Sequence, residues 1–171
     1  MRKRNIIPAA GALATAAAIA IVNTAGRAGA AATAKNEQFT AITTNPGSGV
    51  ASLIATGGFT AGGTVLVVKH AETVRFANGD FKIQLGGPGS KHQNLNLSSC
   101  LFTKTGSGAY RIEHGTGAYR GISGSGKISF TLRAAFPLVN GKCPPNDLPG
   151  TSGNPAAIQF IETASGPVTL P

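Results

Sequence analysis

The sequence GTGAYRGISGSGKISFTLRAAF, residues 115–136, joins a glycine-rich corner to a stretch of regular alternation. The corner holds five glycines, at Gly115, Gly117, Gly121, Gly124 and Gly126. Beyond it, apolar side chains alternate with polar ones, as in a strand with one buried face. The expected core face is Ile128, Phe130, Leu132, Ala134 and Phe136, and the expected solvent face is Lys127, Ser129, Thr131 and Arg133. Because glycine readily adopts the conformations of sharp bends, the stretch predicts a strongly bent antiparallel sheet.

The chain beyond residue 34 contains about seven to nine short strand patterns separated by turn signals, which indicates an all-β barrel or sandwich. Closure into a barrel removes exposed strand edges, so we predict a single antiparallel β-barrel of about eight strands. Residues 35–49 are expected to form a loosely held arm, and residues 86–94 a polar loop. A turn is expected at 106–108, and a break in the last strand at Gly166-Pro167.

The clearest local signal is a β-hairpin around Asn78 and Gly79, because Asn-Gly is the strongest two-residue turn signal. With these two residues as the turn, Phe76 is expected to lie opposite Phe81. The apolar residues of both strands then share one face.

Residues 1–34 have the layout of a secretory signal peptide. Basic residues at 2–4 precede an apolar run at 9–22, and A-x-A cleavage sites end at Ala30 and Ala34. A membrane anchor is the alternative, but the run is shorter than the ~20 residues that span a bilayer. The pattern therefore predicts a cleaved signal peptide.

The remaining domain, residues 35–171, is expected to be extracellular, with no stable membrane anchor after cleavage. Its 11 basic and 6 acidic residues give a net charge of +5. The basic residues are spread singly along the chain, whereas nucleic-acid binding favours a clustered stripe, so no nucleic-acid partner is expected. Cys100 and Cys143 are the only cysteines, and in an exported chain such a pair is expected to form a disulfide.

No cofactor or metal site is expected from the sequence. Residues 121–127, GISGSGK, are similar to a phosphate-binding loop, but Ile128 stands where Ser or Thr would bind magnesium, and a strand pattern follows in place of a helix. His70, His92 and His114 are dispersed over three segments, without the short spacing typical of metal ligands.

No catalytic residue is assigned either, although enzymatic activity stays an open alternative. Glu72 and Glu113 are possible acids, but alternation places Glu113 with Arg111 on a solvent face. The chain has no G-x-S-x-G nucleophile elbow.

Five parts of the chain together resemble a family of small secreted bacterial proteins of unknown function: VRFANGDFKI, Cys100, HGTGAYRGISGSG, Cys143 and the terminal ASGPVTL. The G-T-G-x-Y-x-G-x-x-G-x-G signature is also similar to the corner of the allene oxide cyclase and dirigent barrel superfamily. That resemblance implies an antiparallel barrel with an apolar cavity. It implies no catalytic residue, because no acid or tyrosine here matches that superfamily's site.

Two functional classes remain open on these observations. One is a non-catalytic secreted barrel that binds a hydrophobic small molecule or acts at the cell surface. The other is a cyclase- or isomerase-like enzyme with its site in the barrel interior. Tyr110 and Tyr119 are the candidate ligand contacts, with the alternative that their hydroxyls bind neighbouring backbone. Inward-pointing ionisable residues would favour an enzyme, and a packed apolar interior would favour a structural or surface role. The sequence does not predict the oligomeric state.

Overall fold

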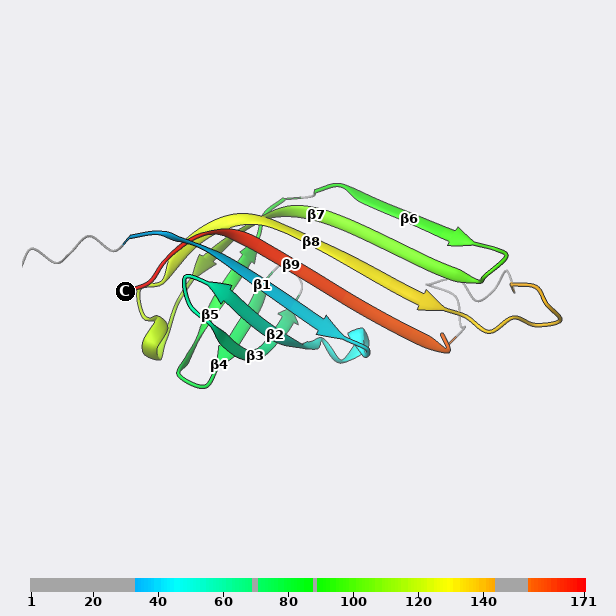
Figure 1. Ribbon diagram of the computed structural model, residues 1–171, viewed down its shortest axis with the longest axis horizontal. Helices are drawn as coiled ribbons and strands as arrows, with labels where there is room; N and C mark the ends of the chain where they lie inside the picture. The colour runs from blue at the N-terminus through cyan, green and yellow to red at the C-terminus, as the bar shows by residue number, and fades with distance from the viewer. Residues whose placement is uncertain (1–32, 69–70, 88, 144–153) are drawn as a thin grey trace, which may run out of the picture. The chain divides into compact units, whose positions relative to one another are not determined.

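The computed structural model describes residues 33–68, 71–87, 89–143 and 154–171. Nearly all of the expected signal peptide, and His70, lie outside these residues. The described chain is all-β and forms a closed antiparallel barrel of eight strands with one additional strand (Figure 1). The predicted fold class is therefore confirmed.

Nine strands and two single-turn 3₁₀ helices make up the described domain. The strands are β1 (Lys35–Thr43), β2 (Val50–Gly57), β3 (Ala61–Val68), β4 (Ala71–Phe76), β5 (Gly79–Leu85), β6 (Lys91–Asn96), β7 (Leu101–Glu113), β8 (Ser123–Ala135) and β9 (Ala157–Thr169). The 3₁₀ helices are η1 (Pro46–Ser48) and η2 (Gly117–Tyr119).

The barrel closes through a pairing between β5 and β7. Neighbouring strands follow the order β5-β4-β3-β2-β1-β9-β8-β7-β6, and β5 also hydrogen-bonds to β7. The strand β6 pairs with β7 outside the closed ring, and in Figure 1 it continues the sheet beyond the barrel. Eight strands thus enclose the interior, and β6 extends an open sheet formed by the far halves of β7, β8 and β9.

The strand β7 shows how the barrel and the open sheet divide. Its residues 110–113 pair with β5, whereas its residues 101–106 pair with β6. On its other side, β7 pairs with β8 along almost its whole length. The strands β5 and β6 therefore separate at residues 107–109 of β7, and a mouth of the barrel lies there.

Four expected interruptions are wrong, because the structure has strands in those places. The arm at 35–49 begins with β1, which pairs with β2 and β9, and the loop at 86–94 gives way to β6 at Lys91. The glycines at 106–108 lie inside β7, and Gly166-Pro167 lies inside β9. In each case pairing with the neighbouring strand overrides the local turn or polar signal.

The hairpin forms, but its predicted register is wrong. Phe76 pairs with Gly79 and Val74 with Phe81, so the two-residue loop lies one position earlier than expected. The partner of each residue is therefore displaced by two positions along the opposite strand. Because side chains alternate between the two faces of a strand with a period of two, the apolar face is preserved. Both Phe76 and Phe81 are buried.

The glycine corner packs directly on the hairpin in this register. Gly79 has a φ of +146°, and a Cβ there would lie 2.3 Å from the carbonyl oxygen of Thr116. Gly117 has a φ of +55°, and its Cβ would lie 2.2 Å from the carbonyl oxygen of Asn78. Between them, the N–H of Ala118 donates to the same Asn78 oxygen at 2.9 Å. Only glycine fits these two positions.

The five glycines of the corner signature serve two different elements. Gly115, Gly117 and Gly121 lie in the turn around η2, and Gly124 and Gly126 lie inside β8. The corner itself is therefore shorter than the sequence suggested.

Two apolar clusters stabilise the domain. The larger fills the barrel and includes Phe39, Leu53, Val65, Val74, Phe76, Phe81, Ile83, Tyr110, Ile112, Tyr119 and Ile128. The smaller lies on the open sheet and is built from Cys100, Phe102, Ala134 and Phe136.

The structure confirms which face of β8 points to the core and which points to solvent. Ile128, Ala134 and Phe136 are buried, and Lys127 is exposed. On the same core face, Phe130 and Leu132 are only half-buried because they lie where β8 leaves the barrel for the open sheet. The remaining solvent-face positions are exposed except for Thr131, which is half-buried.

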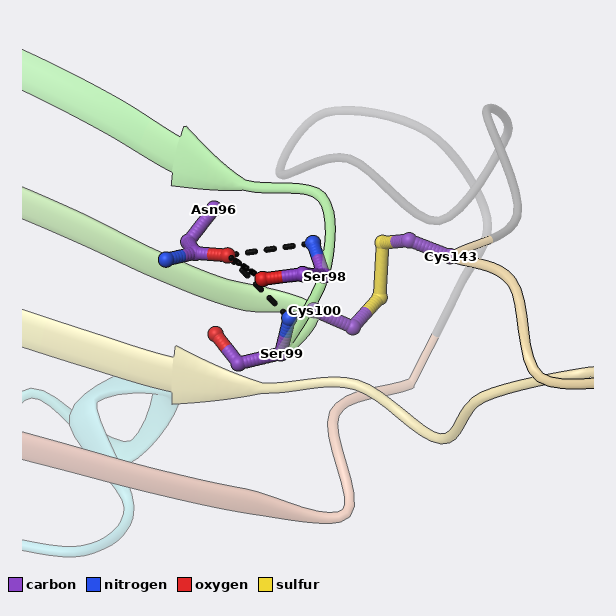
Figure 2. Close-up of a disulfide and its surroundings, with 5 residues drawn as sticks. All are labelled: Asn96, Ser98, Ser99, Cys100 and Cys143. Atoms are coloured by element: carbon purple, nitrogen blue, oxygen red, sulfur yellow. Dashed lines mark hydrogen bonds between the residues drawn. A yellow bond between two sulfur atoms is a disulfide. The ribbon is translucent and has the colours of Figure 1, made fainter.

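The expected disulfide between Cys100 and Cys143 is present, with Cα atoms 5.1 Å apart (Figure 2). Cys100 is fully buried and belongs to the smaller cluster. The preceding turn is held by the side-chain oxygen of Asn96. It accepts hydrogen bonds from the backbone N–H groups of Ser98 and Ser99 at 3.0 and 3.1 Å, and from the Ser98 hydroxyl at 2.7 Å.

Candidate functional site

Three carboxyl groups are buried in the barrel. Glu37 and Glu72 are each 2% exposed, and Glu162 is 9% exposed. Carboxylates are almost never this buried unless they are paired or protonated, because removing the charge from water is costly. The interior is therefore not purely apolar, and these groups are the first candidates for function.

Glu72 and Glu162 lie on opposite walls of the barrel. Glu72 is on β4 and Glu162 on β9, and around the ring three strands separate them in each direction. Their side chains nevertheless meet, and a side-chain hydrogen bond joins the two carboxyl groups. Small residues on the wall between them leave space for this contact. Ala41 on β1 pairs with Glu162, and Ala51 on β2 is buried in the same core.

The pair shares a proton. Burial, the negative charge of Glu72 and a hydrogen bond to Glu72 raise the pKa of Glu162 to about 8. Burial also raises the pKa of Glu72, and the hydrogen bond from Glu162 opposes that rise. At neutral pH, Glu162 is therefore the protonated partner that donates to Glu72. The Oε1 atom of Glu72 has no hydrogen-bond partner.

A pocket of about 650 Å³ opens beside Glu162, at the mouth where β5 and β6 separate. Its apolar wall is formed by Leu85, Ala109, Ile128 and Phe130, and its rim includes Lys91 on β6. This volume lies within the range of small-molecule sites. A mostly apolar wall with a few polar groups at one point is also typical of such sites.

Two glycines of β7 shape the pocket. A Cβ at Gly106 would lie 2.4 Å from the ring of Phe130, so that ring lies flat against the backbone. Gly108 lines the pocket itself, and a Cβ there would have no neighbour closer than 3.9 Å. The missing side chain at Gly108 is thus part of the open volume.

The other end of the barrel is filled by aromatic rings. Phe59 and Tyr119 have ring centroids 5.5 Å apart, and each also packs edge-on or tilted against Phe76 at 5.9 and 5.4 Å. Phe81 joins them at 5.6 Å from Tyr119. A guest would therefore reach the pocket at the mouth and not the centre of the barrel.

Glu37 lies toward this filled end, in the strand that the sequence had suggested was an arm. Its Oε2 atom accepts a hydrogen bond from the backbone N–H of Phe59 at 3.0 Å, and its Oε1 atom has no partner. Burial raises the pKa of Glu37, against the effect of that backbone hydrogen bond. A smaller cavity of about 200 Å³, lined by Glu37, Phe59 and Leu170 among others, opens at this end.

The structure separates the two candidate tyrosines from the larger pocket. Tyr110 and Tyr119 are both buried, and neither lines that pocket. Burial, and secondarily the charge of Glu37, raises the pKa of both phenols. The Tyr110 hydroxyl has no hydrogen-bond partner, so the suggested bond to neighbouring backbone is not made there.

The other residues singled out in the sequence lie apart from the pocket. Glu113 is half-exposed and forms an ion pair with Arg111 at 2.6 Å, as the alternation of β7 suggested. His92 is exposed on β6, and the Nε2 atom of His114 lies 3.7 Å from Glu113. Within the described residues, no group of three or more His, Cys, Asp or Glu side chains is arranged to hold a metal ion.

No family model matches the chain, and neither a curated protein nor a solved structure is significantly similar to it. In the described ranges, no helix has the length and apolar character needed to cross a membrane.

Proposed function

We propose that the protein is a secreted barrel that binds a hydrophobic small molecule in the pocket at the β5–β6 mouth. The observation that carries the proposal is the pocket of about 650 Å³ beside Glu162, with Leu85, Ile128 and Phe130 on its wall. A disulfide in the domain is compatible with an oxidising compartment, which supports export. The resemblance of the glycine corner to the allene oxide cyclase and dirigent superfamily, and of the chain to small secreted bacterial proteins, belongs to the same proposal.

The ligand site is the mouth and not the interior that the sequence suggested. Phe59, Phe76, Phe81 and Tyr119 fill the opposite end, so the proposed guest lies where β5 and β6 separate. Tyr110 and Tyr119 are accordingly replaced as ligand contacts by Leu85, Ile128 and Phe130 in this proposal.

A pair of glycine variants tests the pocket. Gly108→Val adds a side chain inside the open volume, where a Cβ has no neighbour closer than 3.9 Å. Gly62→Val is the matched control, because a Cβ at this exposed position of β3 meets nothing within 4 Å. Both variants should fold.

The measurements are mass spectrometry of small molecules that co-purify with the secreted protein, and thermal-shift screening with fatty acids, terpenoids and phenolics. Wild type and Gly62→Val should retain a ligand and show shifts, and Gly108→Val should lose both. A ligand that binds equally to all three proteins would place its site elsewhere. If no ligand is found in any of the three proteins, binding is rejected and a non-catalytic role at the cell surface is the alternative.

A second candidate function is a cyclase- or isomerase-like enzyme, and the Glu72–Glu162 pair favours it. A protonated carboxyl group beside an apolar pocket has the properties of a general acid, with its pKa near neutrality. The test is to incubate the recovered ligand with wild type and with Glu162→Gln. An isomer of equal mass that forms only with wild type would support catalysis, and an unchanged ligand would support binding alone.

A further inference from the structure

The buried carboxyl pair lacks a positive counter-charge in the described part of the chain. The ion pairs found there involve Glu113, and none involves Glu72 or Glu162. Both groups are buried, and a proton shared between them neutralises only one, so ionisation of the other places a negative charge in an apolar interior. Such a charge is costly unless a cation or several hydrogen-bond donors approach it.

Glu72 also has an acceptor that nothing satisfies. Its Oε1 atom is fully buried and without a partner, and the shared proton supplies a single hydrogen bond between the two groups. An ammonium group offers three donors and a positive charge, which a hydroxyl or an ester does not. Glu162 lines the pocket, and Glu72 lies behind it, so a group entering from the mouth meets Glu162 first.

The pocket wall suits the rest of such a molecule. Leu85, Ile128 and Phe130 offer an apolar surface, and the Phe130 ring stacks on Phe160 with centroids 5.8 Å apart. Lys91, the charged residue on the rim, lies on the exposed strand β6, where solvent screens it.

We propose that the ligand of this pocket is a hydrophobic amine whose ammonium group binds at Glu162 and Glu72 while its apolar part lies against Leu85, Ile128 and Phe130. This inference rests on the proposed function, because it names the class of ligand for the same pocket. On binding, the ammonium group supplies the positive counter-charge, and the two carboxyl groups keep their shared proton.

Three probes of equal length separate the possible chemistries: n-octylamine, 1-octanol and octanoate. Their binding is measured by titration calorimetry at neutral pH with wild type, the double variant Glu72→Gln/Glu162→Gln, and Glu113→Gln. Glu113→Gln is the matched control, since it removes a carboxylate on the outer face of the barrel. Gln keeps the shape of Glu and both donates and accepts hydrogen bonds, so the double variant should fold without any charge at the pair.

Wild type and Glu113→Gln should bind octylamine about tenfold or more tighter than octanol, because only the amine gains the buried ion pair. The double variant Glu72→Gln/Glu162→Gln should remove that preference and leave octanol binding unchanged. Octanol or octanoate binding as tightly as octylamine, or a preference for the amine that survives in the double variant, would overturn the inference.

The same probes distinguish a failure of the amine preference from a failure of the proposed function. If octanol or octanoate binds and Gly108→Val abolishes that binding, the pocket is a ligand site and only the ligand class is wrong. If none of the three probes binds wild type, both the pocket function and its amine preference are rejected.

Discussion

The carboxyl groups of Glu72 and Glu162 meet inside the barrel from strands on opposite walls. Both side chains therefore cross toward the barrel axis, where small residues such as Ala41 leave space. Glu162 gives the lining of the mouth pocket a polar group, and the pair places two carboxyl groups in a largely apolar core. Its consequences for stability can be measured without knowing any ligand.

Stability should decrease as the pH rises from about 4.5 to about 8. The pKa of Glu162 is about 8 in the fold against an ordinary value of 4.5, so the folded protein keeps a proton that the unfolded chain releases. The stabilisation of the folded state by this bound proton is complete below pH 4.5 and is lost as the pH rises through 8. The pKa values of Glu37 and Glu72 are raised too, so they act in the same direction. Urea unfolding across this range measures the slope.

The variant Glu162→Gln should flatten that profile. A shift of this size corresponds to about 3–5 kcal/mol, so the variant should be more stable than wild type at pH 8 by up to that amount. Glu113→Gln should keep the wild-type slope, because its carboxylate is half-exposed and paired with Arg111. An unchanged slope in Glu162→Gln would show that other groups control the pH dependence.

Gly117→Ala should destabilise the protein strongly. The residue has a φ of +55°, and a Cβ would lie 2.2 Å from the carbonyl oxygen of Asn78, so the corner would have to move off the hairpin. The left-handed conformation alone costs about 1–2 kcal/mol, and the displaced contact adds to it. Gly62→Ala, whose Cβ meets nothing within 4 Å, should change stability by less than about 1 kcal/mol. Equal effects in chemical denaturation would contradict the packing of the corner on the hairpin.

The sequence allowed the fold class to be predicted, whereas the burial of Glu72 was not predicted although its position in β4 carried a signal for it. Alternation places Glu72 on the same face as Val74 and Phe76, and all three are buried. Glu162 also alternates with core residues, but Ile161 beside it is apolar, so the two faces of β9 look alike in the sequence. The meeting of the two groups depends on strand order, which local patterns do not encode.

The pocket could not be predicted for a similar reason. It exists because β5 and β6 pair with different halves of β7, and the sequence around Gly106 and Gly108 is typical of a turn. Pairing along the whole of β8 keeps that glycine-containing segment extended. The strand β6 was missed because nearly all of its residues are exposed. The strand β1 was missed because its buried face carries Glu37 and the small Ala41 beside Phe39, so its apolar alternation is weak.

Two phenylalanines should differ in how much they stabilise the fold. Phe39 is 2% exposed in the barrel core, and Phe39→Ala should cost about 3–5 kcal/mol. Phe130 shares the core face of β8 but is half-buried at the pocket, so Phe130→Ala should cost clearly less. Equal losses in urea unfolding would mean that Phe130 is packed as tightly as the barrel core, leaving little room for a ligand.

Replacing both cysteines, in the double variant Cys100→Ala and Cys143→Ala, should lower stability without preventing the barrel from folding. The bond closes a loop of 43 residues, which corresponds to about 4 kcal/mol in the chain-entropy model. It lies in the smaller cluster with Phe102 and Phe136, away from the β5–β7 pairing that closes the barrel. Hydrogen exchange should therefore accelerate more at the amides of β6 and the first half of β7 than at those of β2. A uniform loss of protection would instead indicate that the open sheet and the barrel unfold as one unit.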